Sequence, residues 1–152
     1  MNVEFITAEH KLDWIAPNKW IHYEPFVARV ICDEWPEPIL IVIPGGYETD
    51  LESVPRQLFL AYWLIKGRFP RGASLHDYLL DLIQGDLGER MRTSLIPFVP
   101  TRDWCDRMFY AAMTAEIALP ERNRTRAADL LAREAAYMGV TAYTAFIKGG
   151  KT

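Results

Sequence analysis

The chain has 152 residues, of which 50% are hydrophobic and 24% are charged, and its net charge is −3. This length suits one compact core, so we expect residues 1–152 to form a single domain. The mild acidity argues against a nucleic-acid binder, which usually has a basic surface. The apolar runs at 39–43 and 60–65 are far shorter than the roughly 20 residues of a membrane span. No membrane span is therefore expected.

The two cysteines, Cys32 and Cys105, do not have the spacing of a zinc site. Both lie next to apolar or aromatic residues, so we expect buried thiols, although a disulfide between them remains an alternative. The N-terminus has neither a basic stretch nor an apolar stretch of the secretory kind. We therefore expect a protein of the cytoplasm, where thiols stay reduced.

Residues 1–52 are rich in strand formers and turn signals. The alternation of apolar and polar residues at 19–33 predicts a strand, and the Ile-rich run at 37–44 predicts a second, buried strand. The sequence DEWPEP between them predicts the turn of a hairpin. The two glycines in PGGYETD, at 44–50, then allow the chain to bend. We expect a small antiparallel N-terminal sheet.

Residues 53–150 have the spacing of apolar residues that is typical of helices. Pro55 suits a first helical turn, Ser74 and Asp77 form a possible capping pair, Thr101 suits an N-cap, and Gly139 suits a kink. The four helices that this pattern predicts span 53–67, 74–85, 101–119 and 125–150. The predicted fold class is α+β, with the sheet packed on a bundle of about four helices.

Two polar residues lie at the start of predicted apolar helix faces. His76 shares its face with Leu79, Leu80 and Ile83, and Asp106 is followed by apolar residues at helical spacing. A buried carboxylate needs a hydrogen-bond partner, an ion partner or a metal. We therefore expect His76 and Asp106 to point inward from successive helices, where they could meet. The alternative is that both are structural.

Further candidates flank these two residues. Asp77 lies about 100° round the helix from His76, and Asp50 follows the glycine bend. Both could instead cap helices. Arg56 and Arg102 could hold an anionic substrate group or form ordinary surface ion pairs.

Three motifs occur in order: IPGGYETDLESVPR at 43–56, SLHDYLL at 74–80 and TRDWCDRMFYAAM at 101–113. Together with YMGVTAYTAF at 137–146, they resemble a family of tailed phages and prophages, domain of unknown function 1353. Two departures are Glu52, where the family usually has a small residue, and a longer loop at 84–100. The resemblance implies phage or prophage origin and no established reaction.

The residues favour a small metal-dependent hydrolase. Its site would consist of Asp50, His76, Asp77 and Asp106, with Zn²⁺ or Mn²⁺ held by His76, Asp106 and Asp50. Its substrate would be peptidoglycan, a nucleotide or a phosphoester. The alternative is a non-enzymatic protein that binds other virion proteins or a host factor, with the same residues as a buried network. Either protein would act in the cytoplasm of the infected host, or in the virion.

Overall fold

The computed structural model describes residues 1–51, 68–120 and 126–149, and within them the chain has an α+β fold. The strands are β1 Asn2–Phe5, β2 Leu12–Ala16, β3 Lys19–His22, β4 Phe26–Cys32, β5 Trp35–Ile43 and β6 Glu48–Thr49. The helices are α2 Pro70–Gln84, the short 3₁₀ helix η1 Glu89–Met91, α3 Arg102–Ile117 and α4 Arg126–Gly149. These ranges hold three α-helices rather than the four expected, and the helix expected at 53–67 lies outside the described residues.

The strands form two antiparallel sheets, with the orders β1-β4-β5 and β2-β3-β6. In β4, alternate residues from Phe26 to Cys32 are buried, which is the pattern of a sheet with one face on the core. Phe26 pairs with Ile43 in the register between β4 and β5. The predicted antiparallel N-terminal sheet is thus confirmed, although it is divided in two.

The strand predicted at 19–33 is wrong in detail, because β3 ends at His22 and β4 begins at Phe26. Pro25 lies in the break and cannot donate a backbone hydrogen bond. The predicted hairpin turn is also shorter than expected, since Cys32 already pairs with Trp35. The prolines 36 and 38 therefore lie inside β5, which is tolerated because β5 is an edge strand.

Helix α2 begins four residues before its predicted start. Pro70 occupies the first turn, where a missing N–H costs nothing, so the predicted capping pair of Ser74 and Asp77 is wrong. The Ser74 side chain is buried and instead lies 3.3 Å from Nε2 of His10. Helix α3 has the predicted N-cap, since Thr101 accepts a hydrogen bond from the backbone N–H of Trp104. Helix α4 runs through Gly139 as one helix.

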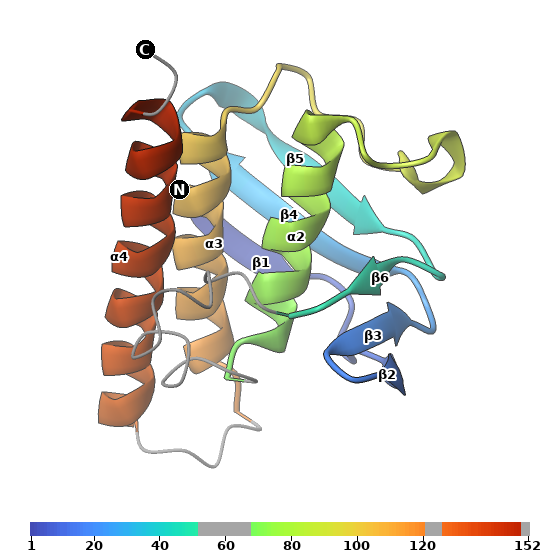
Figure 1. Ribbon diagram of the computed structural model, residues 1–152, viewed down its shortest axis with the longest axis horizontal. Coiled ribbons are helices and arrows are strands. Elements are labelled where there is room, and N and C mark those ends of the chain that lie inside the picture. Colours follow the sequence, from blue (N-terminus) through green and yellow to red (C-terminus); the bar gives the residue numbers. More distant parts are fainter. Residues whose placement is uncertain (52–67, 121–125, 150–152) are drawn as a thin grey trace.

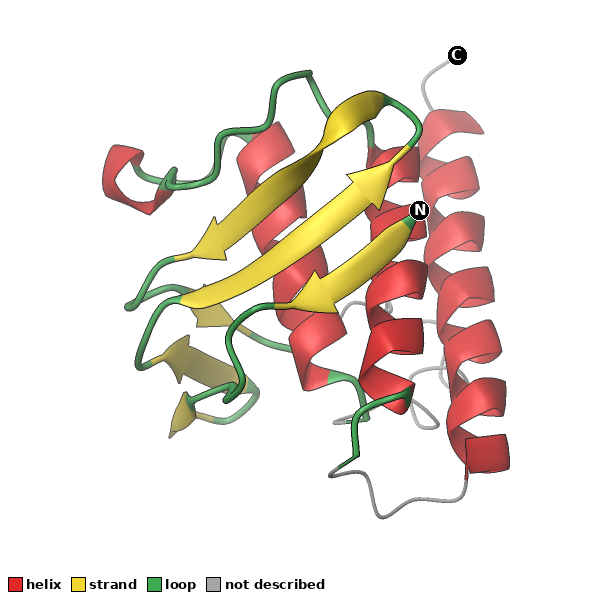
Figure 2. Ribbon diagram, turned by 180° about the vertical axis from the view of Figure 1, so that it is seen from behind, coloured by secondary structure: helices red, strands yellow, loops and turns green. Residues whose placement is uncertain are grey.

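The helices form layers on the larger sheet (Figures 1 and 2). Helices α2 and α3 cover one face of β1-β4-β5, and α4 packs beside α3 at the edge of the molecule. The main core joins sheet residues such as Ile41 to Leu75 of α2 and Met108 of α3. A second core joins Phe109 of α3 to Ala136 of α4. Both cysteines are buried free thiols, as expected.

Candidate functional site

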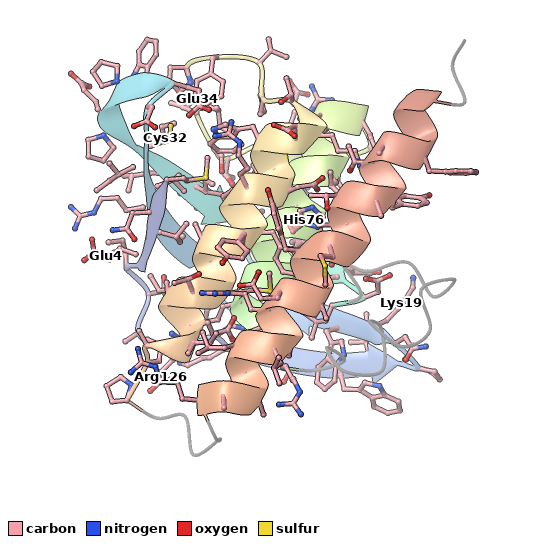
Figure 3. All side chains as sticks on the ribbon, turned by 90° about the vertical axis from the view of Figure 1, so that its left-hand side faces the viewer. Glu4, Lys19, Cys32, Glu34, His76 and Arg126 are labelled. Carbon is pink, nitrogen blue, oxygen red and sulfur yellow. The ribbon has the colours of Figure 1, made fainter. Side chains whose placement is uncertain are left out.

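His76 and Asp106 meet between α2 and α3. Nε2 of His76 lies 2.9 Å from Oδ1 of Asp106, and each residue is 1% exposed. Figure 3 shows His76 in the interior behind α3 and α4, whereas Glu4 and Lys19 lie at the periphery. The prediction that these two residues point inward and meet is confirmed. Any catalytic or metal-binding role for them stays a prediction.

The other oxygen of Asp106 is held by the third helix. The hydroxyl of Thr144, on α4, donates a hydrogen bond of 2.6 Å to Oδ2 of Asp106. Nε of Arg102 donates in turn to the Thr144 hydroxyl at 3.2 Å, and the Arg102 guanidinium lies 5.4 Å from the centre of the Tyr143 ring. Arg102, predicted as a substrate-binding residue, is therefore linked to His76 through Thr144 and Asp106.

Sequence reasoning missed Thr144. Its signal was present, because Ala136, Val140 and Thr144 follow one another at four-residue spacing on one helix face. All three are buried. A hydroxyl on an otherwise apolar buried face must find a polar partner, and Asp106 is that partner.

His76 is a neutral imidazole, and one of its two ring nitrogens has no hydrogen-bond partner among the described residues. Burial lowers its pKa below the ordinary value, and the opposing effect of Asp106 is smaller. A carboxylate can only accept, so Nε2 carries the proton and donates to Asp106. The imidazole stacks on Phe109, with ring centres 4.9 Å apart. Nδ1 is then a buried lone pair with no hydrogen-bond partner in the described part of the chain.

Asp77 belongs to a different group of side chains. The Thr49 hydroxyl, on β6, donates a 2.6 Å hydrogen bond to Oδ2 of Asp77. One turn along α2, Asp81 accepts a 2.8 Å hydrogen bond from the Tyr47 hydroxyl. Burial raises the pKa of Tyr47, and the charges of Asp77, Asp81 and Asp50 raise it further. The acidic residues therefore gather near Tyr47, on the side of α2 that faces β6.

The predicted site is thus divided. His76 and Asp106 lie between helices, whereas Asp77 bonds to β6 and Asp50 is exposed just after that strand. Arg56 lies outside the described residues. Across 1–51, 68–120 and 126–149, no three or more His, Cys, Asp and Glu side chains are arranged to hold a metal ion.

The bonds within the pair limit how a metal could bind. Nε2 of His76 and both oxygens of Asp106 already have hydrogen-bond partners. The predicted arrangement, with both residues as ligands of one ion, would require this direct hydrogen bond to break. Nδ1 of His76 is the potential ligand atom of the pair that has no hydrogen bond within the described residues. The Zn²⁺ or Mn²⁺ ion stays a prediction.

Comparison with known proteins identifies the family. Residues 27–140 match the model of a protein family of unknown function, DUF1353, so the chain belongs to that family, as its motifs indicated. No curated protein and no solved structure is significantly similar to the chain. Phage origin and a place in the virion stay predictions. None of the helices in the described residues has the length and apolarity to cross a membrane.

Proposed function

We propose that this protein is a hydrolase in which His76 is the general base. The observation that carries the proposal is the unequal state of its two ring nitrogens. Nε2 bonds to Asp106, while Nδ1 is buried without a partner among the described residues. Buried polar atoms usually have partners, and among the described residues both ring nitrogens of His22 and Nε1 of Trp104 are exceptions as well. His76 differs from these because its second nitrogen bonds to a carboxylate. A base held by a carboxylate through one nitrogen uses the other nitrogen to accept a proton.

The chemistry follows from this arrangement. Because Nδ1 is buried, the packing around it would have to open to admit water and substrate. Nδ1 would then accept a proton from a water molecule as the water oxygen attacks an acyl carbon or a phosphorus atom. Asp106 would stabilise the imidazolium formed, and its own position is fixed by Thr144. The imidazolium would then give the proton to the leaving oxygen or nitrogen, so the products are an acid and an alcohol or an amine. The lowered pKa of His76 keeps the imidazole neutral, and therefore able to accept a proton, at pH 7.

A screen of substrate classes tests the proposal. The purified protein would be assayed with chromogenic carboxylic esters, phosphate monoesters and diesters, and with peptidoglycan. We expect one class to be hydrolysed, with a loss of about 10²- to 10⁴-fold in His76→Ala and in Asp106→Asn. Asp103→Asn is the matched control, because Asp103 lies on the same helix but is exposed. Hydrolysis of no class by the wild type, or full activity in His76→Ala, would contradict the proposal.

The predicted metal ion can be tested in the same preparation. Elemental mass spectrometry would measure Zn and Mn in the wild type, in His76→Ala and in Asp50→Asn. About one metal per chain, lost in both variants, would support metal-assisted hydrolysis with Asp50 as a ligand. A metal-free protein that still hydrolyses its substrate would support His76 as a base that acts alone.

The second candidate is a non-enzymatic protein that binds virion or host proteins. It is favoured by the closure of the pair, since His76 and Asp106 are each 1% exposed. A network closed to solvent can fix the junction of three helices without any chemistry. Under this hypothesis His76→Ala lowers the melting temperature, and neither the wild type nor the variant hydrolyses any substrate class.

A further inference from the structure

Helix α4 carries large apolar side chains on its outward face. Leu131, Met138 and Phe146 are 71%, 64% and 79% exposed. They follow one another at intervals of seven and eight residues, so they lie along one side of the helix. The smaller residues on the same side include Ala135, Ala142 and Ala145. We call these six residues the α4 outer face.

The opposite side of α4 packs against α3 and holds α4 in the fold. Ala132, Ala136 and Val140 are buried in the core that α4 shares with α3. Figure 1 shows α4 at the edge of the molecule, and Figure 2 shows that β1-β4-β5 does not extend over it. A surface helix normally turns its polar side to water. The α4 outer face is therefore unusual for a side that only contacts solvent.

Charge is also missing from most of this face. Residues 135–147 contain no charged side chain. The nearest acidic residue is Glu134, which accepts a 2.8 Å hydrogen bond from the Tyr110 hydroxyl and pairs with Arg133. The face therefore presents little charge that a partner would have to match or desolvate. A partner with an equally uncharged, apolar helix fits it best.

The α4 outer face is complementary to itself. Its large and small residues have nearly the same spacing when the helix is followed in either direction. In an antiparallel pair centred beside Met138, Leu131 would lie opposite the partner's Phe146, and Ala135 opposite the partner's Ala142. A twofold interface needs this correspondence, in which one patch meets its own copy. The antiparallel direction also sets the helix dipoles in opposition, which is favourable.

We propose that the protein forms a homodimer through antiparallel contact of the α4 outer faces. Covering these side chains on both copies would remove about 1,000 Å² of surface from water, near the lower limit for a specific interface. The expected dissociation constant is therefore about 1–100 µM. The dimer does not depend on the proposed hydrolase activity.

Sedimentation velocity at 1–300 µM protein tests the dimer. We expect the wild type to change from monomer to dimer with concentration and Met138→Lys to stay monomeric. Leu40→Lys is the matched control, because Leu40 is 52% exposed on β5, away from α4, and this variant should dimerise like the wild type. A wild type that is monomeric throughout, or a dimer that survives Met138→Lys, would overturn the proposal. Binding of another protein to a monomeric wild type would likewise overturn it.

Disulfide trapping tests the antiparallel geometry without weakening the apolar contact by a charge. Under mild oxidation, Met138→Cys should cross-link to its own copy, because the two positions lie beside the axis. Phe146→Cys should not, since the two positions would be about 22 Å apart along the helices, beyond disulfide reach. The native thiols of Cys32 and Cys105 are buried and should not interfere. Efficient cross-linking of Phe146→Cys, or none of Met138→Cys, would contradict the antiparallel pair.

Discussion

The hydrogen bond between Nε2 of His76 and Oδ1 of Asp106, at 2.9 Å, joins α2 to α3 in the interior of the protein. Thr144 extends this contact to α4 through Oδ2 of the same carboxylate. One carboxylate therefore accepts hydrogen bonds from two other helices. This arrangement determines which ring nitrogen of His76 carries the proton. The proposed activity and the stability of the helical layer both depend on it.

Loss of the imidazole should destabilise the fold. In His76→Ala, Asp106 stays buried but loses one of its hydrogen-bond donors. Removal of one hydrogen-bond donor from a buried carboxylate costs about 1–3 kcal/mol, which we expect as the fall in the free energy of unfolding. Urea unfolding of the variant, with Asp103→Ala as an exposed control, measures this. An unchanged midpoint in His76→Ala would mean that the carboxylate is not held as described.

Thr144 should act through its hydroxyl group. Thr144→Val keeps the shape of the side chain but leaves Oδ2 of Asp106 and Nε of Arg102 without this partner. We expect a loss of about 1–3 kcal/mol in the free energy of unfolding. Thr144→Ser, which restores the hydroxyl, should recover most of it. Equal stabilities of the Val and Ser variants would show that the methyl group, rather than the hydroxyl, matters.

Two other histidines should make stability fall in acid. Burial lowers the pKa of His22 from 6.5 to about 4, and the pKa of the adjacent His10 is lowered to about 3. Above pH 6.5 both are neutral in the folded and unfolded chains, so they add no pH dependence. Between pH 6.5 and 4 the unfolded chain takes up the protons first. His22 alone should then lower the free energy of unfolding by up to about 1.4 kcal/mol per pH unit.

Unfolding curves at a series of pH values measure this slope. His22→Phe should make the slope smaller between pH 6.5 and 4, because one of the three histidines with a lowered pKa is removed. Tyr23→Phe is the control, since Tyr23 neighbours His22 but is 71% exposed. The same slope in the wild type and in His22→Phe would mean that His22 does not stay neutral in the folded protein.

Gly85 should be required at the end of α2. Its φ of 81° is in the left-handed region, where a side chain is disfavoured. Apart from the adjoining backbone, no atom of the described residues lies within 4 Å of where a Cβ would be. Gly85→Ala should therefore lower the free energy of unfolding by about 1 kcal/mol through the backbone alone. Gly85→Asn should cost less. Thermal unfolding compares the three proteins, and a fully stable Ala variant would contradict the assigned cap.

The sequence was sufficient to predict α3, α4 and most of α2, because apolar spacing and end signals agree there. It also predicted the meeting of His76 and Asp106, since both begin apolar faces of successive helices. It placed Asp77 in the same site, but adjacent helix residues point about 100° apart, and Asp77 bonds to Thr49 of β6. Strand β6 has only two residues, which is too short for a recognisable alternation.

The local sequence was also insufficient to predict β1 and the start of α2. Strand β1, Asn2–Phe5, is held by its pairing with β4, and such long-range pairing is not visible in four residues. Ser74 has the local pattern of an N-cap, but tertiary packing extends the helix back to Pro70. Sequence signals therefore located the helix faces, while the partners across elements came only from the fold.

The role of His76 as a general base depends on the protonation state of its imidazole, which can be measured directly. Long-range ¹H–¹⁵N correlation spectra at pH 7, with His76→Gln for assignment, would report each ring nitrogen separately. We expect a proton on Nε2, hydrogen-bonded to Asp106, and an unprotonated Nδ1. Protons on both nitrogens at pH 7 would make the pair an ion pair. His76 could not then act as a general base, and the hydrolase proposal would fail.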